Sequence, residues 1–332
     1  MDDRNEEVFQ KYDLKINNMY RARGALLLDT NQGLKLFGKC GASEAHLEYE
    51  NNVRKHLLEQ GYQNIDIYIA NKEGNLITED SQGERYAVRN WFQGEECNLK
   101  DMEEAGKAAK NLAILHKAMS NLPFQEEFIP KDKKLHEVFK KHNRELKRVR
   151  SYILDKKQKN EFEVRFLKVF DSFYSQGAEA EEMLLGSAYE QMMNEAVDKG
   201  RVVHGSYNYH NVLFTRGGIA TTNFDKAGFG IQIYDLYHFI RKAMEKNNWN
   251  IPFGMKMIES YNKEKQLEKD EITMLYILLL YPEKFWKVTN YYYNNKKSWI
   301  SARNIQKLAG IQQQEDQKNL FLQKLKNYCI MK

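Results

Sequence analysis

The chain has 332 residues, of which 42% are hydrophobic and 29% charged, and its formal net charge is +5 at pH 7. This composition excludes a globally disordered chain, and so small a charge excess gives no indication of a nucleic-acid partner. Three cysteines, Cys40, Cys97 and Cys329, lie too far apart for a disulfide framework or a zinc site.

The N-terminus and the apolar runs of the sequence give no sign of membrane insertion. The first ten residues are acidic and polar, without the apolar stretch of a signal peptide. The longest apolar run, Leu275–Tyr281, is too short to cross a bilayer. We therefore expect a soluble protein that is synthesised in the cytoplasm and has no membrane span.

The first hundred residues predict short strands with one helix. Residues 25–29 and 34–37 are apolar runs joined by a turn with Gly33, a pattern typical of a hairpin. Residues 44–60 repeat apolar side chains at helical spacing and stop before Gly61. The strand pattern then returns in two segments, 65–69 and 86–92.

After a polar connection at 93–97 the pattern becomes helical. The helices that we expect span 102–119, 135–153, 162–174 and a segment ending at 198, and one strand–loop–strand unit follows them. This order predicts an α+β, two-lobed fold in which a small antiparallel-sheet lobe with one helix meets a larger helical lobe at a cleft. We divide the chain into a β-rich lobe, residues 1–93, and a helical lobe, residues 94–332, which carries the loop 204–225.

One segment of the helical region is strongly basic. Residues 131–168 contain 14 Lys and Arg against 6 Asp and Glu. Such a segment indicates either the solvated outer faces of two helices or a surface for an acidic partner.

The strand–loop–strand unit carries the pattern that bears most directly on function. Its parts are the loop His204-Gly-Ser-Tyr-Asn-Tyr-His-Asn211, a hairpin with the turn Arg216-Gly-Gly218, and the segment Asn223-Phe-Asp225. It resembles the catalytic loop and metal-binding strand of the aminoglycoside phosphotransferase and choline kinase group, which show H-G-D-x-x-x-x-N, a hairpin and then a hydrophobic-D-F segment. The residues at matching positions are His204, Gly205 and Asn211.

Two positions depart from that pattern. Ser206 stands where the group has the aspartate that accepts the proton of the substrate hydroxyl, and loss of a general base typically costs about 10²–10⁴ in rate. Asn223 stands where the group has the aspartate that holds magnesium, and an amide brings no formal charge to a hard cation. If this segment is extended, Asp225 points to the same side as Asn223 and offers a shifted carboxylate; otherwise Asp225 belongs to the following turn.

The resemblance also implies a nucleotide site, for ATP with Mg²⁺. Lys35 matches the strand lysine that contacts nucleotide phosphates, and Glu50 is its expected helix partner, with Glu48 as the alternative. Two surface charges, or a purely structural pair, would have the same spacing. Trp91 stands at the hinge, where it either faces an adenine or belongs to the core. The first strands contain no G-x-G-x-x-G motif.

Three further residues are expected to support the loop. Asp235 matches the aspartate at the start of the helix behind the loop, where it caps the helix and binds loop N–H groups. His204 is expected to hold the shape of the loop rather than to transfer protons. His210 is expected to be a loop contact, with a catalytic base as the alternative.

Segments outside the loop narrow the family. They are Trp91-Phe-Gln-Gly94 with Cys97, the segment 235–242, Trp249, the segment Tyr281–Trp286, Tyr291-Tyr-Tyr293 and Trp299. These segments resemble the CotS-type spore-coat proteins of endospore-forming bacteria, over about residues 12 to 325. The resemblance implies synthesis in the mother cell, incorporation into the spore coat, and other spore-coat proteins as partners. We expect the tail aromatics to pack against the helical lobe, namely Phe285, Trp286, Tyr291 and Trp299.

The sequence leaves three functional hypotheses. The first is a catalytically impaired, kinase-like coat or assembly component that retains nucleotide binding through Lys35 and Asn211. The second is an active ATP-dependent phosphotransferase on a small-molecule or protein hydroxyl, with Asp225 as a rearranged metal ligand. The third is a binder of polyanions through the basic segment 131–168.

Overall fold

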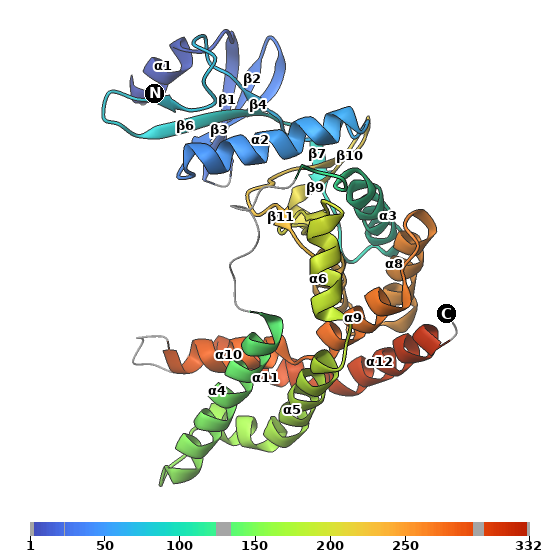
Figure 1. Cartoon of the computed structure of the whole chain (residues 1–332). Helices are drawn as coiled ribbons and strands as arrows, with labels where there is room; N and C mark the ends of the chain where they lie inside the picture. The colour runs from blue at the N-terminus through green and yellow to red at the C-terminus, as the bar shows by residue number, and fades with distance from the viewer. Residues whose placement is uncertain (1–2, 23, 124–133, 295–301, 331–332) are drawn as a thin grey trace.

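The structure is a computed structural model, and it describes residues 3–22, 24–123, 134–294 and 302–330. A small lobe with a twisted sheet lies against a larger lobe of helices (Figure 1). The α+β, two-lobed class expected from the sequence is confirmed. The boundary between residues 93 and 94 stays a prediction.

The small lobe is built on an antiparallel six-stranded sheet. Its strands follow the order β1-β2-β3-β6-β4, and β5 pairs with β6. The expected hairpin forms β2 and β3, and Gly33 has a φ of +82°, the conformation that favours glycine in such a turn. The bounds are β1 (Ile16–Ala22), β2 (Ala25–Thr30), β3 (Gly33–Lys39), β4 (Tyr68–Ile69), β5 (Thr78–Glu79) and β6 (Arg85–Asn90).

Two elements at the start of the chain were not expected. Helix α1 (Asp3–Gln10) and strand β1 precede the hairpin. Strand β1 lies at the edge of the sheet, where most of its side chains are exposed, so its sequence lacks the apolar alternation that marks a strand. The segment expected as a strand at 65–69 pairs only at its end, since Ile65 instead bridges to Thr221 of the other lobe.

Helices cover both faces of the sheet (Figure 1). On the face toward α1, Phe37 stacks on Tyr86 with 4.9 Å between ring centroids, and Val8 of the helix packs beside them. Helix α2 (Glu44–Glu59) lies on the other side, between the sheet and the helical lobe. It begins where the Ser43 side chain accepts a hydrogen bond from a first-turn N–H, as an N-cap does.

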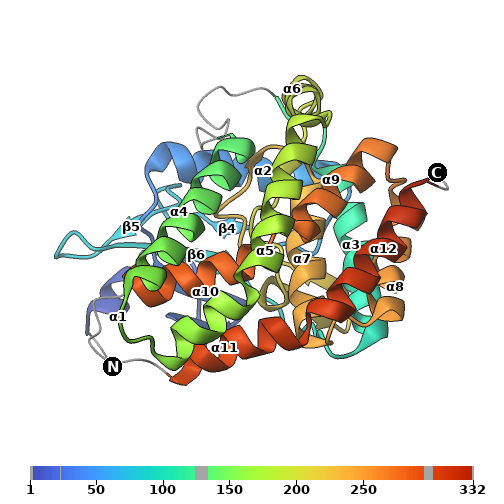
Figure 2. The same ribbon diagram turned by 90° about the horizontal axis from the view of Figure 1, so that it is seen from below.

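The helical lobe has two cores. Helices α3 and α8 pack closely in the main core. Helices α4, α5, α10 and α11, whose labels lie to the left of α3 and α8 in Figure 2, enclose a second cluster that includes Phe162, Phe166 and Phe285. The helices are α3 (Met102–Ala118), α4 (Leu135–Asp155), α5 (Glu161–Leu185), α6 (Tyr189–Asp198), α7 (Ile233–Lys246), α8 (Ile251–Glu264), α9 (Lys269–Leu280), α10 (Glu283–Asn294), α11 (Ala302–Gln313) and α12 (Glu315–Ile330).

Two small sheets carry the expected strand–loop–strand unit. Strand β8 (Val202–Val203) pairs with β11 (Gly228–Phe229), and β9 (Val212–Thr215) forms a hairpin with β10 (Gly218–Thr221). The segment that was expected to be a polar connection instead forms β7 (Gly94–Glu96) beside β9. Its side chains are exposed, so only its backbone pairing makes it a strand. A Cβ on Gly94 would stand 2.5 Å from the Phe214 carbonyl oxygen, and this close approach requires glycine.

The tail aromatics pack as expected at two positions. Phe285 is fully buried, and Trp286 stacks on His142 with 3.4 Å between ring centroids. Tyr291 is 53% exposed, so the expectation of burial was wrong for this residue: it lies on the solvent side of α10. Trp299 lies outside the described residues.

The basic segment lies mostly on the outer faces of α4 and α5. Several of its cations pair with acids, among them Lys156 with Glu163 at 2.6 Å and Arg165 with Glu161 at 2.9 Å. Residues 131–133 of the segment lie outside the described ranges. Over the helices that are described, none is long and apolar enough to span a membrane.

Candidate functional site

A cavity of about 910 Å³ lies between the small-lobe sheet, α2 and the strand–loop–strand unit. This volume falls in the range of about 300–1,000 Å³ that is usual for small-molecule sites. The predicted site residues that line it are Glu50, Trp91, His210, Asn211, Asn223 and Asp225. Four other predicted residues do not line it, namely Lys35, His204, Ser206 and Asp235.

A buried carboxylate holds the start of the loop. Asp235, at the beginning of α7, accepts hydrogen bonds from the backbone N–H of His204 at 2.6 Å and of Gly205 at 2.9 Å. His116 of α3 reaches the same carboxylate through Nε2 at 3.1 Å, and its Nδ1 meets the Tyr261 hydroxyl at 2.7 Å. Burial alone would raise the pKa of Asp235, but the hydrogen bond from His116 holds it below its ordinary value.

The His204 ring connects two segments of the site through hydrogen bonds at both of its nitrogens. The backbone N–H of Ser206 donates to His204 Nδ1 at 3.2 Å, so the ring carries its proton on Nε2 and donates it to the Thr222 carbonyl at 3.2 Å. Burial lowers the pKa of His204, which keeps this ring neutral. His204 therefore joins the loop to Thr222, which lies between the end of β10 and Asn223.

Gly205 occupies a position that only glycine fits. Its φ is +70°, and an added Cβ would stand 2.2 Å from the Lys226 carbonyl oxygen. At the other end of the loop, the Asn211 side chain donates to the Ser206 carbonyl at 2.9 Å. The turn of the loop is thus fixed by contacts that need neither catalytic aspartate.

The segment that would hold a metal is not extended. Asn223 has a φ of +68°, and Asp225 begins a turn whose Ala227 N–H donates to Phe224 at 3.0 Å. The extended conformation considered for this segment is therefore wrong, because the backbone turns at Asn223. Both side chains nevertheless line the cavity, and the carbonyl of Asp225 meets Nε2 of His46 at 3.0 Å.

The expected ion pair between Lys35 and Glu50 does not form. Leu36 and Gly38 line the cavity, so Lys35 and Phe37, which alternate with them along β3, lie on the opposite face of the sheet. Its ammonium donates to the Gln32 carbonyl at 2.5 Å, and burial lowers the pKa of this lysine. The alternative partner, Glu48, is exposed on α2.

A chain of four charges, three of them buried and the fourth partly exposed, takes the place of that pair. Glu50 accepts a hydrogen bond from Arg54 at 2.9 Å and one from the Tyr68 hydroxyl at 2.8 Å. Asp66 lies 3.4 Å from Arg54 and accepts from Arg89 at 2.8 Å. Burial alone would lower the pKa of Arg54, but the two carboxylates raise it above its usual value. Sequence reasoning missed Arg54 and Asp66, although Glu50 and Arg54 stand four residues apart on a helix.

Two residues at the mouth of the cavity join its walls. His210 Nδ1 meets the Glu96 carboxylate at 2.6 Å, which ties the loop to β7. Trp91 is half-buried on the cavity wall rather than inside a core cluster, and its backbone N–H donates to Leu34 at 2.9 Å.

The oxygen donors at the positions where the resemblance places magnesium include one carboxylate, so they bring little negative charge to a divalent cation. The positions that would face it offer the amides of Asn211 and Asn223 and the single carboxylate of Asp225. Hard divalent cations are usually bound through several carboxylates or by a carboxylate together with substrate phosphates. Within the described ranges, no cluster of three or more His, Cys, Asp or Glu side chains could hold a metal ion.

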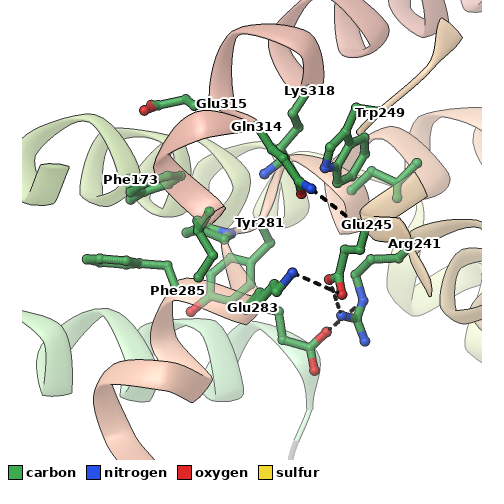
Figure 3. A pocket seen from close by; sticks show the side chains of 14 residues that line it. Phe173, Arg241, Glu245, Trp249, Tyr281, Glu283, Phe285, Gln314, Glu315 and Lys318 are labelled. Atoms are coloured by element: carbon green, nitrogen blue, oxygen red, sulfur yellow. Dashed lines mark hydrogen bonds and ion pairs between the residues drawn. The ribbon is translucent and has the colours of Figure 1, made fainter. Parts of the chain in front are cut away.

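A second, much smaller hollow of about 40 Å³ lies inside the helical lobe (Figure 3). Ion pairs occupy its polar side: Arg241 with Glu245 at 2.7 Å and with Glu283 at 3.3 Å. Aromatic side chains of the tail, Tyr281 and Phe285, form its apolar wall. Because it is small and its acids are paired, this hollow supports packing of the lobe rather than a nucleotide.

Comparisons with known proteins agree with this geometry. The family model described as "Spore coat putative kinase YutH" matches residues 5–325. Spore coat protein S of Bacillus subtilis (strain 168) is 22% identical over 302 residues, which is 90% of this chain and 85% of that protein.

Solved structures show the same fold. An aminoglycoside phosphotransferase from Alicyclobacillus acidocaldarius has a TM-score of 0.89 at 18% identity, covering 98% of this chain and 96% of that chain. A spectinomycin phosphotransferase in complex with ADP and spectinomycin has a TM-score of 0.65 at 12% identity, covering 94% and 97% of the two chains.

Proposed function

Because the chain belongs to the YutH family of kinase-like spore coat proteins, we propose that it is a catalytically impaired member that serves as a coat or assembly component. It is made in the mother-cell cytoplasm and joins other coat proteins. The cleft retains nucleotide binding. Family membership and the likeness to spore coat protein S support the coat role, and the nucleotide complexes of the structural neighbours support the cleft.

The observation that carries this proposal is the chemistry of the cavity wall. Phosphoryl transfer depends on positioning and on neutralising charge at the phosphates. Here an amide, Asn223, faces the cavity where a metal carboxylate is needed, and a hydroxyl, Ser206, stands in the loop where a base is needed. The loop itself is fully braced by Asp235 and His204, so its conformation does not depend on the missing acids.

The test is a phosphotransfer assay on the intact chain. ADP release is measured with ATP and Mg²⁺, and a melting curve checks the fold. We expect a cooperative melting transition and no Mg²⁺-dependent turnover. The double variant Ser206→Asp/Asn223→Asp is the matched comparison, because it supplies both carboxylates in the same frame. Steady phosphorylation of a hydroxyl acceptor by the unaltered protein would refute the proposal.

A second candidate function is an active phosphotransferase that uses Asp225. One observation favours it: Asp225 lines the cavity, and His46 holds its backbone carbonyl at 3.0 Å. In this case ATP and Mg²⁺ together would raise the melting temperature more than ATP alone. The variant Asp225→Ala would then remove the Mg²⁺-dependent part. If that variant behaves like the unaltered protein, this candidate fails.

A further inference from the structure

Arg89 is a cation on the inner wall of the cavity. It belongs to β6, in which Ala87 and Arg89 face the cavity while Tyr86 and Val88 pack on the α1 side. Its side chain keeps 21% of its surface exposed, in contrast to the fully buried Arg54. Arg89 therefore reaches the space from which the strand lysine is turned away.

One carboxylate oxygen fixes the guanidinium beside the altered metal position. Asp66 Oδ2 accepts from Arg89 Nη1 at 2.8 Å and also from the backbone N–H of Asn223 at 3.0 Å. The two donors thus share one acceptor atom. Arg89 is held next to Asn223 by a residue that does not itself line the cavity.

The unused N–H donors of Arg89 leave it able to bind an anion. A guanidinium has five N–H donors, and the hydrogen bond to Asp66 uses one of them. Arg54 and Arg89 together balance the carboxylates of Glu50 and Asp66, so Arg89 offers directed N–H donors rather than an excess of positive charge. The remaining donors of Arg89 can form the paired, charge-assisted hydrogen bonds that guanidinium groups make with phosphate.

The other charges on the cavity wall limit what can bind. Among the described residues, the lining carries two Lys or Arg side chains, Lys39 and Arg89, against three Asp or Glu side chains, Glu50, Glu96 and Asp225. Lys39 lies at the rim and pairs with Glu84. A ligand with several negative charges would therefore meet repulsion, whereas one phosphate group can be matched by the N–H donors of one guanidinium.

We propose that Arg89 binds a single phosphate group of a nucleotide without a divalent cation, so that the cleft prefers a nucleoside monophosphate to the free nucleoside and to the triphosphate. This inference rests on the nucleotide binding proposed above. It assigns to β6 the phosphate contact that the sequence had predicted for β3.

The experiment is calorimetric titration of the intact chain with adenosine, AMP and ATP in the presence of EDTA. AMP is expected to bind about ten- to a hundredfold more tightly than adenosine, as hydrogen bonds to a charged group suggest. Arg89→Met is expected to bring the two affinities together. Arg85→Met is the matched control, because Arg85 lies on the same strand but outside the cavity lining, and it should leave the ratio unchanged.

If Arg89→Met keeps the preference for AMP over adenosine, or if ATP binds more tightly than AMP in EDTA, the inference is overturned. If Arg89→Met does not fold, Arg89→Lys replaces it: lysine keeps the charge but not the planar fork, so the ratio should fall several-fold, and an unchanged ratio overturns the inference.

A separate titration distinguishes this inference from the proposed nucleotide site. If the unaltered protein binds neither adenosine nor AMP, the proposed nucleotide site fails. Inorganic phosphate is then titrated. If phosphate binds and Arg89→Met abolishes that binding, the proposed anion site is supported. If phosphate does not bind, the proposed anion site fails as well.

Discussion

The loop frame, formed by Asp235, His116 and His204, differs from the reactive positions, Ser206 and Asn223, in how strongly the rest of the molecule holds its residues. Asp235, His116 and His204 are buried, and their hydrogen bonds join the loop to α7, α7 to α3, and the loop to Thr222 just after β10. Ser206 and Asn223 are half-buried, and neither side chain is needed by that network. The frame can therefore persist while the reactive positions change, so a kinase-like loop is evidence of a fold and not of an activity.

Removing the carboxylate of the frame should have the largest effect. Asp235→Ala leaves two backbone N–H groups and the His116 ring without their buried acceptor. We expect a loss of about 3–5 kcal/mol in the free energy of unfolding. Ser206→Ala is the control at a reactive position and should stay within about 0.5 kcal/mol. Urea denaturation measures both, and similar losses for the two variants would contradict the comparison.

The corrected ion pair gives a second contrast, in the small lobe. Arg54→Met leaves Glu50 and Asp66 buried beside each other, at an expected cost of about 3–4 kcal/mol. Lys35→Met removes an ammonium whose partner among the described residues is the Gln32 carbonyl, so its cost should be below about 1 kcal/mol. Chemical denaturation of the two variants would contradict the assignment if Lys35 proved the more important residue.

Glycine substitutions separate backbone strain from steric overlap. Gly205→Ala combines a positive φ with a Cβ that would overlap the Lys226 carbonyl, and should cost about 2–4 kcal/mol. Gly33→Ala meets a similar φ but has nothing within 4 Å of the added Cβ, so about 1–2 kcal/mol is expected. Thermal melting of both proteins tests the difference. Equal losses would mean that the loop can move away from Lys226.

The buried histidines predict a smaller, pH-dependent effect. Burial lowers the pKa of His116 and of His204, so the folded protein keeps both neutral while the unfolded chain protonates them near pH 6.5. The contribution of these two histidines to the free energy of unfolding is therefore fully present above that pH. It falls by up to about 1.4 kcal/mol per pH unit and per histidine as the pH decreases further. Urea titrations at pH 7.5, 6.5 and 5.5 measure the slope.

A variant identifies one of the protons involved. His204→Gln should reduce the dependence of the free energy of unfolding on pH by about one proton, whatever it does to the free energy itself. A slope that stays unchanged in this variant would show that His204 does not titrate on unfolding.

The hairpin and the contact between Asp235 and the loop could be predicted from the sequence because their signals are local. The spacing from His204 to Asn211, the hairpin behind it and the aspartate at the start of α7 lie within about thirty residues of one another. Glu50 was also placed on the inward face of its helix, because the apolar side chains on either side of it define that face. Which partner it meets depends on contacts between elements, and spacing alone does not determine these.

The prediction for Lys35 was wrong because the sequence does not determine which alternating set of β3 side chains faces the cleft. Apolar residues stand on both faces of β3, since α1 covers one side of the sheet and α2 the other. With two covered faces, alternation cannot say which set of side chains faces the cleft. A one-residue difference in that alternation moves a lysine from one face to the other. Arg89 was overlooked for the same reason, since its strand also has two covered faces.

The most direct measurement of the central claim is the affinity of the intact chain for ATP, titrated calorimetrically with and without Mg²⁺. If the loop frame has kept its shape while its acidic positions have become neutral, Mg²⁺ should change the dissociation constant by less than about tenfold, or 1.4 kcal/mol. A much larger gain in affinity with Mg²⁺, removed by Asp225→Ala, would show a working metal site and contradict the account.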